Sequence, residues 1–194
     1  DALAGNLCRC TGYGPILAAG QAMGVDPERP DALIAALTGV RPSEALRIEH
    51  AGRRFLAPRT LAEFSTAVQQ NPEATVLAGG TDVGLWVTKQ HRDLPTLISI
   101  NEVAELRRID DLGDAVRIGA AVRYADAAPA LGELHTEFGE LLRRLGGLQV
   151  RNLGAICGNI ANGSPIGDMP PALIAAGATL VLRRPGNPVS ALAA

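Results

Sequence analysis

The pattern of apolar and polar positions divides the chain into a short first region and a longer second one. An apolar run at residues 16–23 opens behind Gly14 and Pro15, an arrangement typical of a helix start. Prolines and glycines interrupt residues 24–54, where only residues 33–37 have helical character. The first region is therefore predicted to be a helix followed by a linker with partial order.

A stronger pattern begins near residue 55. Thr60 and Glu63 have the spacing of a capping box, and apolar residues then repeat at helical spacing as far as Asn71 and Pro72. Further helices are predicted at residues 83–88, 134–145 and 168–176. Short apolar runs between turn residues predict strands at 74–78, 96–100, 106–109, 115–118 and 178–182. The mixture of helices and strands indicates the α+β fold class.

Composition and charge restrict the function. The chain has 194 residues and a formal net charge of −2, and no run of Lys or Arg is longer than two residues. An electrostatic surface for nucleic acid is therefore not indicated. No apolar stretch approaches the roughly 20 residues that span a bilayer, and no signal segment opens the chain. We expect a cytoplasmic protein with neither nucleic acid nor membrane as a partner, and we assign no catalytic residue.

Two of the three cysteines lie close together just before the first predicted helix. Cys8 and Cys10 are too near in sequence for an unstrained disulfide, and thiolates at this spacing suit a metal centre. Considered without their neighbours, two buried structural thiols are an equally good interpretation.

A glycine segment follows the predicted strand at 74–78. In residues 79–82, Gly-Gly-Thr-Asp, glycine permits positive φ and close approach, so that backbone N–H groups can converge on phosphate oxygens. The alternative is a tight turn between strand and helix. A P-loop is disfavoured because Leu85 and Trp86 stand where Lys and Ser or Thr are required. A Rossmann site is disfavoured because no G-x-G-x-x-G occurs.

A second segment of chemical interest is residues 155–165. It combines small side chains with amide and hydroxyl donors and shows no clear period, so we predict a loop that holds the backbone of a ligand. A buried turn in which Asn159 and Asn162 satisfy local carbonyl groups is the alternative.

These features together resemble a known family. Residues 6–13, Asn-Leu-Cys-Arg-Cys-Thr-Gly-Tyr, resemble the last cysteine pair of the iron-sulfur domain in xanthine dehydrogenases, aldehyde oxidases and related molybdenum hydroxylases. Residues 76–83 resemble the first FAD loop of this family, and residues 149–175 resemble the second. The resemblance covers nearly the whole chain apart from the linker.

The resemblance implies the domain organisation. Residues 1–23 would be the helical end of a 2Fe-2S-binding domain, residues 24–54 a linker, and residues 55–194 a mixed α+β FAD-binding domain. The chain begins with Asp1 rather than Met, and its last residues follow a strand-like run without a closing element. We therefore expect both ends to be cut and the flavin domain to be incomplete at its C-terminus.

The resemblance also implies two cofactors. Cys8 and Cys10 would hold a 2Fe-2S cluster together with an upstream C-x-x-C pair that this sequence lacks. Residues 76–83 would surround the FAD pyrophosphate and the nearby ribityl chain, and Asp168 would accept hydrogen bonds from a polar part of FAD. The implied FAD contacts are Val76, Leu77, Ala78, Gly79, Gly80, Thr81, Asp82, Val83, Leu145, Ala155, Ile156, Cys157, Gly158, Asn159 and Asp168.

Two residues depart from the family pattern. Leu145 stands where many members have a Phe beside the isoalloxazine ring, and Cys157 stands where they usually have Gly. Loss of an aromatic contact removes roughly 0.5 to 1.5 kcal/mol. We therefore expect weaker flavin retention, and equal FAD content in wild type and Leu145→Phe would count against this expectation.

The resemblance finally implies an activity. In this family a molybdenum centre oxidises a substrate C–H group, and electrons pass through 2Fe-2S clusters to FAD and then to NAD or another acceptor. The chain would be the electron-transfer subunit of a xanthine dehydrogenase type oxidoreductase of purine catabolism. Its partner would be a molybdenum-cofactor-binding large subunit in a hetero-oligomer. The alternatives are the corresponding subunit of an aldehyde oxidase or CO dehydrogenase type enzyme, or a cofactor-free scaffold homologue.

Overall fold

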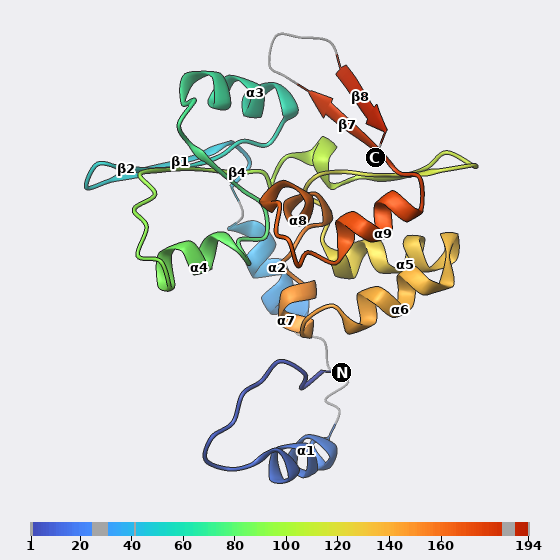
Figure 1. Ribbon diagram of the computed structural model, residues 1–194. Coiled ribbons are helices and arrows are strands. Elements are labelled where there is room, and N and C mark those ends of the chain that lie inside the picture. The colour runs from blue at the N-terminus through green and yellow to red at the C-terminus, as the bar shows by residue number, and fades with distance from the viewer. Residues whose placement is uncertain (1, 25–30, 41, 184–188, 194) are drawn as a thin grey trace.

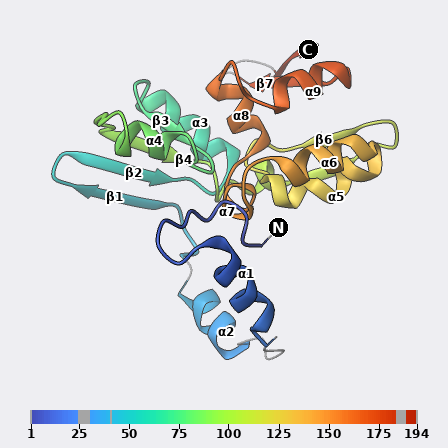
Figure 2. The same cartoon turned by 60° about the horizontal axis from the view of Figure 1, so that its bottom comes forward.

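The computed structural model describes residues 2–24, 31–40, 42–183 and 189–193 (Figures 1 and 2). The helices are α1 (Tyr13–Ala22), α2 (Asp31–Gly39), α3 (Leu61–Gln70), α4 (Val83–Thr88), α5 (Tyr124–Leu134), α6 (Thr136–Arg144), α7 (Leu148–Arg151), α8 (Ile156–Asn162) and α9 (Met169–Ala175), with a 3-10 helix η1 at Ala104–Arg107. The strands are β1 (Leu46–His50), β2 (Arg53–Ala57), β3 (Thr75–Leu77), β4 (Thr96–Ser99), β5 (Ile109–Asp111), β6 (Val116–Ile118), β7 (Thr179–Arg183) and β8 (Val189–Ala193). The α+β fold class is confirmed.

The main sheet has the strand order β1-β2-β4-β3. β1 and β2 form an antiparallel hairpin, whereas β4 runs parallel to both β2 and β3. Ile98 on β4 is 0% exposed and lies at the centre of this sheet. α3 packs on β4 and η1, and Figure 1 shows α3 above the sheet and α4 below it. Because β3 ends at Leu77, the glycine segment at residues 79–82 begins at the carboxyl edge of the sheet.

The strand β1 lies within residues 24–54, where the sequence predicted a linker and no strand. All five of its residues are exposed, so the strand is held by pairing with β2 rather than by a buried apolar face. The hairpin turn contains Ala51 and Gly52, both with positive φ. The sheet therefore starts before residue 55, and the predicted domain boundary at that residue stays a prediction.

The capping box predicted at the start of α3 is confirmed. The Thr60 hydroxyl accepts the Glu63 N–H at 3.2 Å, and Glu63 Oε2 accepts the Thr60 N–H at 3.0 Å. Glu63 Oε2 also accepts the Arg59 N–H at 2.8 Å. These bonds lower the pKa of the Glu63 carboxyl, because its ionised form accepts all of the available donors.

Thr60→Ala is expected to lower the free energy of unfolding by about 1 kcal/mol, since it leaves a helix-terminal N–H without an acceptor. The matched control is Thr66→Ala in the same helix. The Thr66 hydroxyl only donates to the Ala62 carbonyl inside α3, so its loss is expected to be neutral or slightly stabilising. Chemical denaturation of the three proteins checks this. An equal loss in both variants would contradict a specific capping role.

A second core lies between α5, α6, α8 and α9, which Figure 1 shows gathered beside the sheet. α5 and α6 form an antiparallel pair joined by a short turn. The predicted helix at 134–145 is therefore shorter than expected: α6 begins at Thr136, while Leu134 ends α5. The sequence did not predict α5, whose interior contains Pro129 and several alanines instead of a clear apolar repeat. Its buried face nevertheless presents Tyr124, Ala127 and Leu131 to this core.

Most other predicted elements agree with the structure, with one strand misplaced. Residues 106–109 were predicted to be a strand, which is wrong for residues 106–107: they belong to η1, and β5 starts only at Ile109. The Leu106 N–H donates to the Val103 carbonyl at 3.1 Å, which is a 3-10 bond. Confirmed within a few residues are the helices at 16–23, 33–37, 61–71, 83–88 and 168–176 and the strands at 74–78, 96–100, 115–118 and 178–182.

The N-terminal segment contacts the second core near α7. Gln149 Nε2 donates to Asn6 Oδ1 at 3.4 Å, and a Cβ on Gly147 would lie 2.7 Å from the Ala4 carbonyl oxygen. The segment that contains Cys8 and Cys10 is thereby attached to the chain beside α7. Among the described helices, none is long and apolar enough to span a membrane.

Candidate functional site

The glycine segment at the end of β3 is held at both sides by hydrogen bonds. The Leu77 carbonyl accepts the Ile100 N–H at 2.9 Å, and the Ala78 carbonyl accepts Asn101 Nδ2 at 3.0 Å. Gly80 has φ +73°, a conformation that favours glycine, and its carbonyl accepts the Gly84 N–H at 2.8 Å. These bonds use carbonyl groups. In the part of the chain that the structure describes, the backbone N–H groups of residues 79–82 donate to no protein acceptor.

Gly79 lies against the backbone of residues 153–154, which directly precede the second segment. A Cβ at this position would lie 2.7 Å from Gly154 Cα and even closer to the carbonyl oxygen of Leu153. No side chain fits there, because the neighbouring atoms are backbone and cannot rotate away. The glycine at 79 is therefore required by the approach of residues 153–154.

The second segment was predicted to be a loop, which is wrong: most of it forms the helix α8. The helix starts after Ala155, whose carbonyl accepts the Asn159 N–H at 3.1 Å, and ends at Gly163 with φ +62°. It was missed because seven residues that include glycine and two asparagines show no apolar period. Gly158 faces the first segment: a Cβ there would lie 3.7 Å from the Ala78 Cβ. The structure thus brings residues 76–83 and 155–159 together.

Asn159 connects α8 to the start of α9. Its side-chain carbonyl oxygen accepts the Met169 N–H at 3.3 Å, so the amide orders a turn ten residues away in sequence. Asp168 occupies the N-cap position of α9, but its carboxylate makes no capping hydrogen bond. Asn159 therefore accepts an N–H group at the start of α9 that the N-cap residue leaves unbonded, and the exposed Asp168 carboxylate is left available to a ligand.

Tyr124 lies where the two segments meet, although nothing in the sequence singled it out. The Tyr124 N–H donates to the Gly154 carbonyl at 2.9 Å, and the residue as a whole is 3% exposed. A Cβ on Gly154 would come within 2.8 Å of the Tyr124 ring. Burial, and then the charges of Asp82 and Asp168, raise the pKa of Tyr124 to about 12. The carboxylate of Asp82 in the first segment and that of Asp168 at the start of α9 therefore lie near the phenol.

The raised pKa of Tyr124 predicts a loss of stability at alkaline pH. The neutral phenol is favoured in the folded state, so its contribution is complete below pH 10, the ordinary pKa, and is lost as the pH rises through about 12. Thermal unfolding of wild type between these values is expected to show a falling midpoint, and the fall is expected to be smaller in Tyr124→Phe. The chain has only two tyrosines, so absorbance of tyrosinate can follow the titration. An identical alkaline decline in both proteins would refute the assignment.

The two departures from the family pattern have different surroundings. Leu145 is 9% exposed and packs in the second core beside Leu142 and Phe138. Cys157, in the first turn of α8, is partly buried, and burial raises the pKa of its thiol. The predicted contacts of both residues with FAD stay predictions.

The cysteine pair lies in the N-terminal segment. Cys8 Sγ accepts the Gly12 N–H at 3.2 Å, and N–H groups of Cys10 and Gly12 lower the pKa of the Cys8 thiol because they favour the thiolate. Cys10 is exposed. Across the described ranges, no three His, Cys, Asp or Glu residues gather in a metal-binding group. A 2Fe-2S cluster takes four thiolates, of which Cys8 and Cys10 would supply two.

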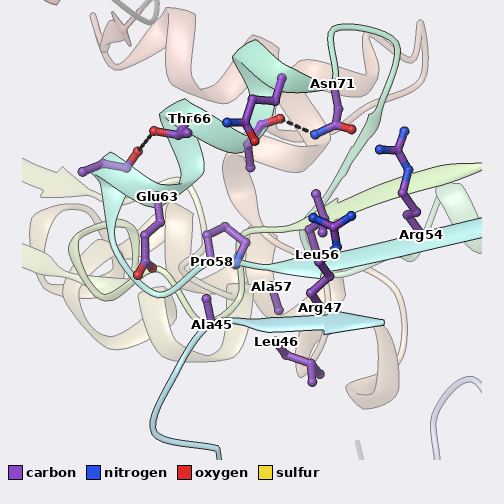
Figure 3. A pocket seen from close by; sticks show the side chains of 13 residues that line it. Ala45, Leu46, Arg47, Arg54, Leu56, Ala57, Pro58, Glu63, Thr66 and Asn71 are labelled. Carbon is purple, nitrogen blue, oxygen red and sulfur yellow. Dashed lines mark hydrogen bonds between the residues drawn. The ribbon is translucent and has the colours of Figure 1, made fainter. Parts of the chain in front are cut away.

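A separate groove of about 460 Å³ lies between the β1–β2 hairpin and α3 (Figure 3). Its lining contains none of the residues predicted to contact FAD or metal. Several of its polar groups are already bonded to the protein: Arg54 donates to Thr96, and Asn71 donates to the Ala67 carbonyl. We therefore place the candidate site where Gly79 meets residues 153–154 rather than in this groove.

Comparison with known proteins identifies related sequences. A family model described as the FAD binding domain in molybdopterin dehydrogenase matches residues 48–192. Xanthine dehydrogenase of Drosophila subobscura is 31% identical over an alignment of 233 positions, which covers 92% of this chain and 17% of the relative. Aldehyde oxidase 2 of Cavia porcellus is 27% identical over an alignment of 250 positions, which covers 96% of this chain and 19% of the relative. The chain thus spans less than a fifth of these relatives.

Solved structures give the same picture of the fold. Carbon monoxide dehydrogenase from Hydrogenophaga pseudoflava matches with a TM-score of 0.68 and 30% identity, covering 75% of this chain and 51% of that chain. Quinoline 2-oxidoreductase from Pseudomonas putida 86 matches with a TM-score of 0.68 at 21% identity, covering 75% and 52%. At that identity the second likeness shows the fold alone.

Proposed function

The chain belongs to the family of FAD binding domains in molybdopterin dehydrogenases, and from this premise we propose that it binds FAD where residues 76–83 meet residues 155–159. It would do so as the electron-transfer part of a molybdenum hydroxylase. Its relatives include xanthine dehydrogenases and aldehyde oxidases, all of them oxidoreductases.

One observation carries the proposal. The N–H groups of residues 79–82, consecutive at the edge of the sheet, have no acceptor among the described residues, while Gly79 leaves no side chain between them and the second segment. Consecutive N–H groups with free donors form a concave site for an anion. The pyrophosphate of FAD is such an anion, so the residues present fit this part of the cofactor.

The protein's own groups would position FAD and keep water from it. The N–H groups of residues 79–82 would hold the phosphate oxygens, and the carboxylates of Asp82 and Asp168 would accept hydrogen bonds from hydroxyl or N–H groups. Leu145 would contact an apolar part of FAD with the small part of its side chain that remains exposed. FAD, when bound, supplies the chemistry of accepting electrons and passing them on. No residue of the chain is assigned a proton-transfer step.

The N-terminal cysteines support a second, separate assignment. Cys8 is surrounded by N–H donors that stabilise its thiolate, which suits a ligand of iron. Cys8 and Cys10 would contribute two thiolates to a 2Fe-2S cluster, and a C-x-x-C pair outside the given sequence would contribute the other two. Cys10 and Gly79 stand in the same chain, so both cofactors would belong to one polypeptide.

We favour a xanthine dehydrogenase type enzyme over its alternatives. The relatives that support it include several xanthine dehydrogenases at 28–31% identity, but aldehyde oxidases follow at 26–27%. A molybdenum-containing large subunit would deliver electrons in a hetero-oligomer, and NAD would accept them from FAD. A CO dehydrogenase type subunit is the runner-up because a structure of that enzyme matches the fold at 30% identity. A cofactor-free scaffold is disfavoured because it has no need for consecutive N–H groups, those of residues 79–82, that find no acceptor among the described residues.

An absorption spectrum and an iron assay of the full-length protein test these assignments together. Flavin bands together with iron, about two atoms for each cluster, are expected in wild type. Cys10→Ala is expected to lower the iron content while FAD is retained, because the two sites share no residue. Flavin without iron in wild type would restrict the proposal to FAD. A folded protein with neither would overturn it.

A further inference from the structure

We propose that Tyr124 is a further binding residue of the flavin site, whose hydroxyl donates a hydrogen bond to a sugar or polyol oxygen of the dinucleotide, near the carboxylates of Asp82 and Asp168. This inference rests on the proposed function, since it names an additional contact within the same site.

The backbone fixes Tyr124 at the junction of the two segments. It opens α5, and its N–H donates to the Gly154 carbonyl at 2.9 Å. The ring lies against Gly154, where a Cβ would approach it to 2.8 Å. Gly154 in turn belongs to the backbone pair that Gly79 touches. The ring therefore supports the contact that joins the first segment to the second.

The hydroxyl of Tyr124 has no hydrogen-bond partner among the described residues, although the residue is 3% exposed. No described side-chain polar atom is both fully enclosed and unbonded, so this oxygen reaches accessible surface at the tip of an otherwise buried ring. Buried tyrosines usually satisfy their hydroxyl, because an unpaired polar group is costly. A donor presented in this way is a candidate contact for a ligand.

The charges around the hydroxyl indicate the class of ligand group. Asp82 and Asp168 lie near enough to raise the pKa of Tyr124, so the phenol stays protonated and acts as a donor. Two carboxylates repel phosphate but accept hydrogen bonds from hydroxyl groups. A sugar or polyol hydroxyl satisfies both kinds of neighbour, since it donates to a carboxylate and accepts from the phenol. The phosphates are accommodated separately, at the N–H groups of residues 79–82.

Titration of the full-length apoprotein with FAD tests the inference. Tyr124→Phe removes the hydroxyl and keeps the ring that packs on Gly154. Loss of one hydrogen bond between neutral groups is expected to weaken FAD binding by about 2- to 10-fold. The thermal midpoint of the variant without FAD is expected to equal or exceed that of wild type at neutral pH, because the hydroxyl has no partner in the free protein. Parallel titrations with FMN and with ADP show whether the ribityl or the ribose part loses affinity.

The outcomes separate the inference from the proposed function. Equal FAD affinity in Tyr124→Phe and wild type overturns the role of the hydroxyl. A lower thermal midpoint of the free variant shows a structural role and also overturns it. Absence of FAD binding by folded wild type overturns the proposed function itself. Asp168→Asn provides a second measurement, since it keeps an acceptor oxygen but removes the charge. A change in its affinity for FAD, with no change in its affinity for inorganic pyrophosphate, supports the polyol assignment.

Discussion

Gly79→Ala is expected to abolish retention of FAD and to destabilise the fold. The added Cβ would meet the Leu153 carbonyl and would lie 2.7 Å from Gly154 Cα, so one of the two segments has to move. Insertion of a methyl group into a closely packed site costs roughly 1 to 3 kcal/mol. The same displacement separates the N–H groups of residues 79–82 from the second segment, and we expect FAD affinity to fall by at least about tenfold.

The matched control is Gly84→Ala, five residues further along the chain. A Cβ there would meet nothing within 4 Å, and the residue lies inside α4. Alanine is favoured over glycine in a helix interior, so this variant is expected to be more stable by about 0.5 to 1 kcal/mol. Denaturation curves and FAD titrations of both variants give the comparison. Gly79→Ala with wild-type stability and affinity would show that the two segments do not touch as described.

Leu142→Ala is expected to cause the largest loss of stability among single truncations near the site. Leu142 on α6 is 1% exposed and packs in the same core as Tyr124, Ile156 and Met169. Truncation of a buried leucine removes apolar contacts and leaves a cavity, which costs about 2 to 5 kcal/mol. Because this core supports α8 and the start of α9, FAD retention is expected to decrease together with stability.

Leu141→Ala is the control for this substitution. Leu141 precedes Leu142 on the same helix but is only partly buried, so less contact area is lost. We expect its cost to be less than half that of Leu142→Ala, as measured by urea denaturation. Equal costs would mean that α6 does not present Leu142 to the core in the described orientation.

Sequence reasoning singled out residues 79–82 because their signal is local. A short apolar strand, glycines that permit an unusual backbone, and the start of a helix all lie within residues 74–88. The capping box at Thr60 and Glu63 was predicted for the same reason, since its two hydrogen bonds join residues three positions apart. Elements fixed by neighbouring residues are readable from the chain alone.

The elements that were missed depend on distant contacts. β1 is fully exposed and exists through pairing with β2, and α5 contains Pro129 and lacks a clear apolar repeat. The role of Gly79 in admitting the backbone of Leu153 joins residues more than seventy positions apart, which no local pattern can show. Tyr124 was missed for the same reason, because its proximity to Asp82 and Asp168 exists only after three parts of the chain have folded together.

The helix α8 illustrates a wrong prediction with a clear cause. Its seven residues were read as a loop because their small and amide side chains show no period. The structure shows that small residues are needed there: Gly158 lies against Ala78, and Asn159 uses its side chain to bond the Met169 N–H. The composition therefore reflects close packing against the first segment rather than an absence of helix.

Hydrogen exchange of the full-length protein with and without FAD tests the central claim most directly. If FAD is held by the N–H groups at the end of β3, its addition slows exchange at residues 79–82 and in the first turn of α8, while the amides of α3 exchange at an unchanged rate. Saturable FAD binding that protects neither segment, or no binding by the folded protein, would contradict the account.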